Sequence, residues 1–133
     1  MIPALPTLLD YKNPQVVAHF CHKNPQYSLE EGQQLFTDLL QWMWLRQQRA
    51  KFQKKTYLFG PLIILDELWH HFILHTHDYL SFCTQYFGCY FHHEVEPIGF
   101  EHQLDQEELN DFLQDCFAYL PNDWIERRFS ECL

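Results

Sequence analysis

Groups that bind metal ions or act as nucleophiles are concentrated between Leu62 and His93, in the sequence LIILDELWHHFILHTHDYLSFCTQYFGCYFHH. This stretch holds two of the five cysteines and an acidic pair. It also holds six of the nine histidines: His70, His71, His75, His77, His92 and His93. Imidazole, thiolate and carboxylate groups are the protein ligands of Zn²⁺ and related ions. The stretch is therefore a candidate metal site and a candidate nucleophile site.

The spacing of the acidic pair places carboxylates beside imidazoles. Residues four apart share one face of a helix, which pairs Asp66 with His70. The same spacing pairs Glu67 with His71. In such a pair the carboxylate either ligates the same metal or orients the imidazole.

The apolar stripe of this helix predicts which histidine is partly buried. The stripe consists of Leu65, Leu68, Trp69 and Phe72. At about 100° per residue, His70 falls near the margin of the stripe, while His71 and His75 point toward solvent. We expect His70 to be a half-buried ligand.

Cys83 can share a metal with His70 only if the chain bends between them. In one straight helix the two residues would be about 20 Å apart along the axis. Thr76 to Asp78 has the form of a second helix start, and a bend there would produce a helical hairpin. The hairpin would gather the candidate ligands Asp66, His70, Cys83 and either His92 or His93. One carboxylate, one thiolate and two imidazoles suit tetrahedral Zn²⁺.

Two alternatives remain open for these residues. A lone cysteine such as Cys83 is usually a small buried hydrophobe. The adjacent His92 and His93 would equally serve to cap a helix terminus.

The elements that must position these groups are predicted to be helices. The predicted helices cover about 14–22, 29–52, 61–74, 76–88 and 105–120, with a further turn or two in 122–129. An extended arm is predicted for 1–12 and a loop, containing Pro97 and Gly99, for 88–103. Strand-like alternation is not found. The prediction is an all-α single domain, 1–133, of about five helices with the His/Cys hairpin at its centre.

Composition narrows the class of protein. With 133 residues, 47% of them hydrophobic, the chain is long enough for one domain with its own core. The net charge of −9 argues against nucleic acid as a partner. Apolar runs fall far short of the roughly 20 residues that a membrane helix requires. An odd number of cysteines without a CxxC pair indicates reduced thiols and a cytoplasmic protein, although a protein delivered into a host cell would look the same.

The basic residues do not alter this conclusion. Five of the nine lie together in the chain: Arg46, Arg49, Lys51, Lys54 and Lys55. We expect them to solvate the last turn of the long helix and to complement its dipole.

The central stretch also resembles a known family. The motif LDxxWHxxILxTxxYxxxC, followed by Gly88 and the pair His92-His93, resembles the core of a family of small uncharacterised bacterial proteins. It is also similar to the helical region of plant glycine-rich domain-containing proteins. The resemblance covers about a quarter of the chain and places Asp66, His70, Cys83 and His92 or His93 on motif positions. Members often carry a second histidine where this chain has Phe72.

The first functional hypothesis is a metal-binding domain, most simply for Zn²⁺. Four protein ligands would make the metal structural, whereas three ligands and a water would leave a catalytic position. Glu67, Glu94 or Glu96 would then be a candidate general base.

Two other functions are compatible with the same residues. Cys83 as nucleophile, with His70 or His92 as base, would make a hydrolase or transferase and needs a partly exposed thiol of lowered pKa. A non-enzymatic module that binds a protein partner would present a histidine-rich surface with an exposed aromatic loop at Tyr90 and Phe91.

Overall fold

The computed structural model describes residues 2–94 and 104–130, and in these ranges the chain forms seven α-helices. They are α1 (Leu5–Leu9), α2 (Pro14–Lys23), α3 (Leu29–Ala50), α4 (Ile63–Leu74), α5 (Thr76–Phe87), α6 (Gln106–Tyr119) and α7 (Asn122–Phe129). A 3-10 turn, Gly60–Leu62, leads into α4. Among the described residues no strand occurs, which confirms the all-α class. None of the described helices is long and apolar enough to cross a membrane.

Two elements differ from the sequence prediction and raise the helix count from about five to seven. The predicted extended arm contains α1, because Pro6 suits a first helical turn and Leu8 is buried in the core. The final turns form the complete helix α7, which buries Trp124, Ile125 and Phe129. In the predicted loop, residues 88–94 are non-helical. The rest of that loop, with Pro97 and Gly99, lies outside the described residues.

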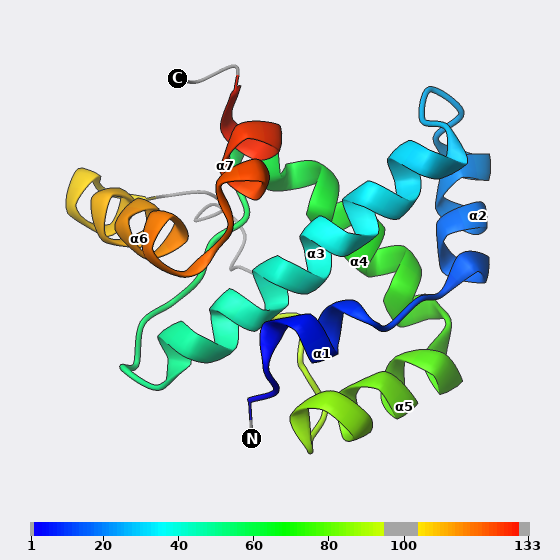
Figure 1. The fold of residues 1–133 in the computed structure, drawn as a ribbon, viewed down its shortest axis with the longest axis horizontal. Helices are drawn as coiled ribbons and strands as arrows, with labels where there is room; N and C mark the ends of the chain where they lie inside the picture. The colour runs from blue at the N-terminus through cyan, green and yellow to red at the C-terminus, as the bar shows by residue number, and fades with distance from the viewer. Residues whose placement is uncertain (1, 95–103, 131–133) are drawn as a thin grey trace.

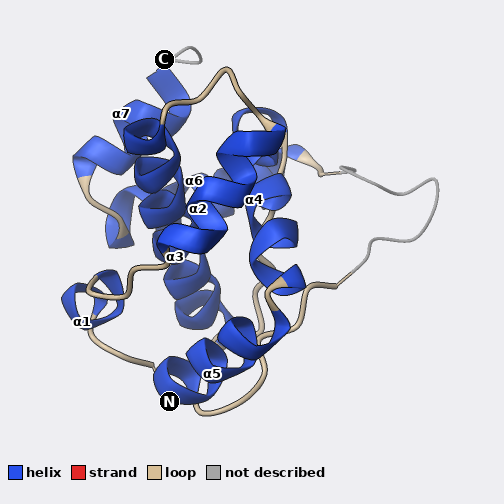
Figure 2. Cartoon of the chain, turned by 90° about the vertical axis from the view of Figure 1, so that its right-hand side faces the viewer, coloured by secondary structure: helices blue, strands red, loops and turns tan. Residues whose placement is uncertain are grey.

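Helix α3 is the central element. Figure 1 shows it running diagonally through the molecule, with α2 beside its N-terminal end and α6 and α7 toward the opposite side. It packs against α1, α2, α4 and α6. An apolar stripe along α3 is buried throughout, at Leu35, Phe36, Leu39, Leu40 and Met43. Figure 2 shows α4 and α5 from the side, with α5 turned away from the axis of α4.

Local sequence signals account for four of the helix ends. Ser28 and Glu31 form a capping box at the start of α3. Asn13 and Asp105 each accept a hydrogen bond from a backbone N–H of the helix that follows them. Gly88 ends α5 in the left-handed conformation, with φ 73°.

The predicted break between α4 and α5 is present, but its cause differs from the one expected. His75 is the joint, with φ −83° and ψ 70°, and no side chain caps α5. Asp78 instead accepts a hydrogen bond from Asn13 Nδ2 at 3.0 Å. The turn buries Tyr79 and Phe82. Tertiary packing therefore positions α5.

Gly32 marks a close crossing of α2 and α3. A Cβ atom at Gly32 would lie 2.5 Å from Cys21 Sγ and 3.1 Å from Val17 Cγ1. We expect Gly32→Ala to lower the free energy of unfolding by about 1 kcal/mol, because overpacking costs roughly 1–3 kcal/mol and the helix-propensity gain returns about 1 kcal/mol. Urea unfolding would measure this change.

The contact with Cys21 provides the control for this prediction. In a Cys21→Ala background the Sγ atom is absent, so Gly32→Ala should cost less than in the wild-type chain. An equal cost in both backgrounds would show that the sulfur is not what makes glycine necessary.

Candidate metal centre

Three potential metal ligands meet at the surface of α4. Asp66 and His70 lie one turn apart on α4, and His93 reaches them from the segment that follows α5. One ligand atom from each residue lies within 4.8 Å of the other two. The structure thus brings together three of the five residues predicted as ligands.

The contacts inside this group are short. His93 Nε2 lies 2.6 Å from Asp66 Oδ1 and 3.0 Å from His70 Nε2. His70 Nε2 lies 3.6 Å from Asp66 Oδ2. An imidazole nitrogen carries either one proton or one in-plane lone pair. A single proton on His93 Nε2 can point along a linear hydrogen bond to only one of these neighbours.

Burial differs among the three side chains. His93 is 18% exposed and Asp66 is 29% exposed, whereas His70 is 55% exposed. The expectation of a half-buried His70 is therefore wrong: its side chain faces outward from α4, and the ring that it contacts is that of His93. Water can reach the group from the His70 side.

The ring of His93 is held against the core. It packs on Trp69, with ring centroids 4.1 Å apart. Trp69 donates from Nε1 to the Tyr79 hydroxyl at 3.0 Å, and that hydroxyl donates to the carbonyl oxygen of Phe91. The segment bearing His93 is therefore tied to both α4 and α5.

Arg46 on α3 also fastens this segment. Its guanidinium donates to the carbonyl oxygen of His92 at 2.7 Å. Its Cζ atom lies 4.5 Å from the centre of the Phe91 ring and 5.6 Å from that of Trp69. Sequence reasoning missed this role because Arg46 sits in a run of basic residues, and nothing in that run distinguishes the one that turns inward.

Cys83 lies apart from the three gathered ligands. Its side chain is 0% exposed, and burial raises the pKa of its thiol. A thiol nucleophile needs exposure and a lowered pKa, so the condition for the hydrolase or transferase hypothesis is not met. The four cysteines among the described residues are all free thiols, as the sequence predicts.

The other predicted site residues are more exposed. His92 packs edge-on to the Tyr90 ring, 4.7 Å away, and is not part of the ligand group. Glu67 and Glu94 are exposed, and Glu96 lies outside the described residues. Phe91 is 3% exposed beside Tyr90 at 41%, so the two do not form the expected exposed aromatic pair.

The opposite side of α4 carries a second group of histidines. His71 and His75 are half-buried rather than pointing freely into solvent as predicted, because α2 packs against this side of α4. His19 of α2 contacts both, with ring centroids 4.9 Å from His71 and 5.5 Å from His75. Burial lowers the pKa of His71, and the neighbouring His19 lowers it further.

The basic residues expected to solvate the end of α3 have internal partners as well. Arg49 is buried and forms salt bridges with Asp111 and Asp115 of α6. Lys54 lies 3.0 Å from Asp111. These contacts join the C-terminal end of α3 to α6. Because Arg49 and Lys54 have acidic partners, they do not form a free basic patch.

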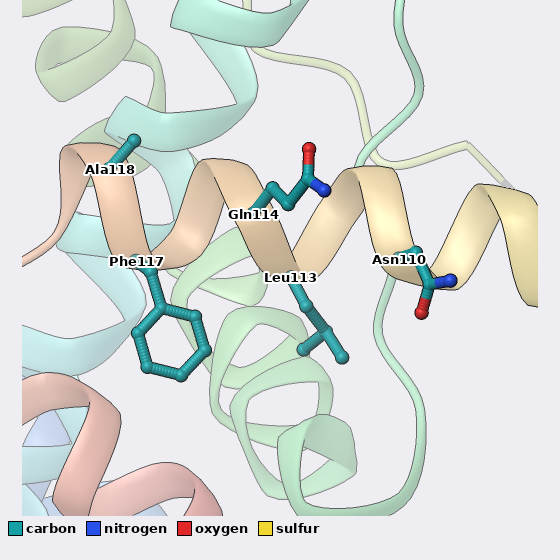
Figure 3. A pocket seen from close by; sticks show the side chains of 5 residues that line it. All are labelled: Asn110, Leu113, Gln114, Phe117 and Ala118. Carbon is teal, nitrogen blue, oxygen red and sulfur yellow. The ribbon is translucent and has the colours of Figure 1, made fainter.

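A surface hollow on α6 offers no ligand group. Its lining consists of Asn110, Leu113, Gln114, Phe117 and Ala118 (Figure 3). None of these side chains titrates or ligates a transition metal strongly. The hollow is therefore not a candidate metal site.

Comparison with known protein families gives one match. The sequence model of the UCP032817-like family matches residues 7–124, a range that includes the whole of the Asp66, His70 and His93 group. No curated protein and no solved structure matches the chain. The similarity to plant glycine-rich domain-containing proteins stays a prediction from the motif.

Proposed function

Since this chain belongs to the UCP032817-like family, whose description names no reaction, we propose from the geometry of its own site that it is a metal-binding protein. The ligands are Asp66, His70 and His93, and the ion is a divalent transition metal, most simply Zn²⁺.

The observation that carries this proposal is the position of His93 Nε2. It faces the Asp66 carboxylate at 2.6 Å and His70 Nε2 at 3.0 Å. One proton cannot serve both contacts in linear geometry, whereas a cation between the three residues can accept one lone pair from each of them. A tetrahedron with bonds of about 2.0–2.1 Å has edges of about 3.3 Å. The separations of 2.6 Å from His93 Nε2 to Asp66 Oδ1, 3.0 Å between the two Nε2 atoms and 3.6 Å from His70 Nε2 to Asp66 Oδ2 lie on both sides of that edge, with the carboxylate turning a different oxygen to each imidazole.

The ligand set also supports an open coordination position. Two imidazoles and one carboxylate form the set found in catalytic zinc sites and in the facial triad of non-haem iron. The 55% exposure of His70 gives a water molecule access to the fourth position. Such a water would be the reactive group of the site, with Zn²⁺ lowering its pKa.

Zinc binding to the full chain, purified without a histidine tag, tests the proposal. We expect one tight equivalent of Zn²⁺ in the wild-type protein by elemental mass spectrometry and chelator competition. Asp66→Asn and His93→Gln should each weaken this equivalent by more than the roughly 10–100-fold that loss of a ligand's supporting partner costs.

Two matched variants separate this site from a four-ligand site. His92→Gln removes the adjacent imidazole, and Cys83→Ala removes the thiol of the predicted set, and both should retain the tight equivalent if circular dichroism shows a native fold. A wild-type protein that binds no Zn²⁺ after reconstitution would overturn the proposal. Loss of the ion in Cys83→Ala alone would replace the three-ligand site by another one.

A further inference from the structure

The histidines on the α2 side of α4 form a cluster separate from the first site. His19 comes from α2, His71 from α4, and His75 from the joint between α4 and α5. All three are half-buried. The cluster therefore lies where three helices meet.

Two nitrogens in this cluster face each other. His75 Nε2 lies 3.4 Å from His19 Nδ1. This separation is close to the edge of about 3.3 Å for a tetrahedral site with metal–nitrogen bonds of about 2.0–2.1 Å. It is long for a hydrogen bond between imidazoles.

One nitrogen of the third imidazole has no hydrogen-bond partner in the part of the chain that the structure describes. His71 Nδ1 is buried and has none among the described residues, which is costly for a polar atom. The His71 ring stands edge-on to His19 and to Phe20, with centroids 4.9 and 5.6 Å away. Glu67 and Lys23 are the charged side chains that act on His71, and they are of opposite sign.

We propose that His19 and His75 bind a second transition-metal ion, and that the His71 ring turns toward this ion to become a third ligand, because its nitrogens are not within 4.8 Å of both other ligand atoms in this structure. Neutral imidazoles are ligands for Zn²⁺, Cu²⁺ and Ni²⁺, and oxygen ligands are not needed for these ions. A bound ion would link α2 to the joint between α4 and α5. Only the Asp66 group, among the described residues, places three ligand atoms within 4.8 Å of one another, so the His19 site should bind more weakly.

A Zn²⁺ titration in a His93→Gln background tests this site without the first one. We expect one remaining equivalent by isothermal titration calorimetry. His75→Gln and His19→Gln, each added to that background, should weaken it by at least about tenfold. Exposed histidines on the same elements provide the controls, because His22→Gln on α2 and His77→Gln on α5 should leave it unchanged.

Thermal unfolding adds a second readout. Zn²⁺ should raise the melting temperature of the His93→Gln protein and should not raise that of His75→Gln/His93→Gln, because only an ion that binds the folded state stabilises it. Absence of Zn²⁺ binding in the His93→Gln background would overturn the second site and leave the Asp66 site untouched. Binding that His22→Gln removes as effectively as His75→Gln would also overturn it.

Discussion

Asp38→Ala is expected to lower the free energy of unfolding by about 3–5 kcal/mol, the usual cost of removing one partner of a buried ion pair. Asp38 lies in the middle of α3 with its side chain 0% exposed. It accepts from Arg127 Nη2 at 2.7 Å, and Arg128 Nε lies 3.1 Å from its other oxygen. Its backbone carbonyl accepts from Trp124 Nε1. This single residue therefore anchors α7 to the central helix.

The cost should come from the two arginines that lose their buried carboxylate, because Arg127 then keeps only its pair with the exposed Asp123. Burial raises the pKa of the Asp38 carboxyl, although both arginines act in the opposite direction. Desolvation thus offsets much of the attraction inside the cluster. We expect Asp38→Ala to cost less in an Arg127→Met background, where one of the stranded charges is absent.

Asp123→Ala is the matched control for Asp38→Ala. Asp123 pairs with the same Arg127 at 3.1 Å but is 69% exposed. An exposed pair of this kind contributes about 0–1 kcal/mol. Urea unfolding of both variants gives the comparison, and equal losses would show that burial of Asp38 contributes nothing special to the docking of α7.

Fold class and several helix boundaries follow from local sequence. The pairs Ser28-Glu31 and Asp105-Glu108, and Gly88 after α5, act within one turn of the chain, so their effect is visible without tertiary information. Helix α1 was not predicted, because what stabilises this five-residue helix is burial of Leu8 in the core.

In the candidate metal centre, too, the features set by local sequence were predictable, and those set by tertiary packing were not. Asp66 and His70 were predictable as an i, i+4 pair on α4. Which of His92 and His93 joins them was not, because neighbouring side chains of a non-helical segment point in different directions. Similarly, the exposure of His70 and the burial of His71 depend on which side of α4 is covered by α2, and a single helix pattern does not contain that information.

Arg46→Met is expected to weaken Zn²⁺ binding at the Asp66 site by about 10–100-fold, although Arg46 touches no ligand atom. The substitution removes the hydrogen bond to the carbonyl oxygen of His92 and the cation–π contacts with Phe91 and Trp69. These contacts hold the segment that carries His93. Without them, the segment must become ordered when the ion binds, and this entropic cost weakens binding.

The sign of the effect distinguishes positioning from charge. By Coulomb's law alone, removing a positive charge near a cation site would tighten Zn²⁺ binding. Burial lowers the pKa of Arg46 while Glu94 raises it, so an acidic neighbour already offsets part of this charge. Lys51→Met removes an exposed charge from the residue that follows α3 and should leave the affinity unchanged. Chelator competition on both variants would decide, since tighter binding in Arg46→Met would mean that Arg46 acts through its charge and not by holding His93.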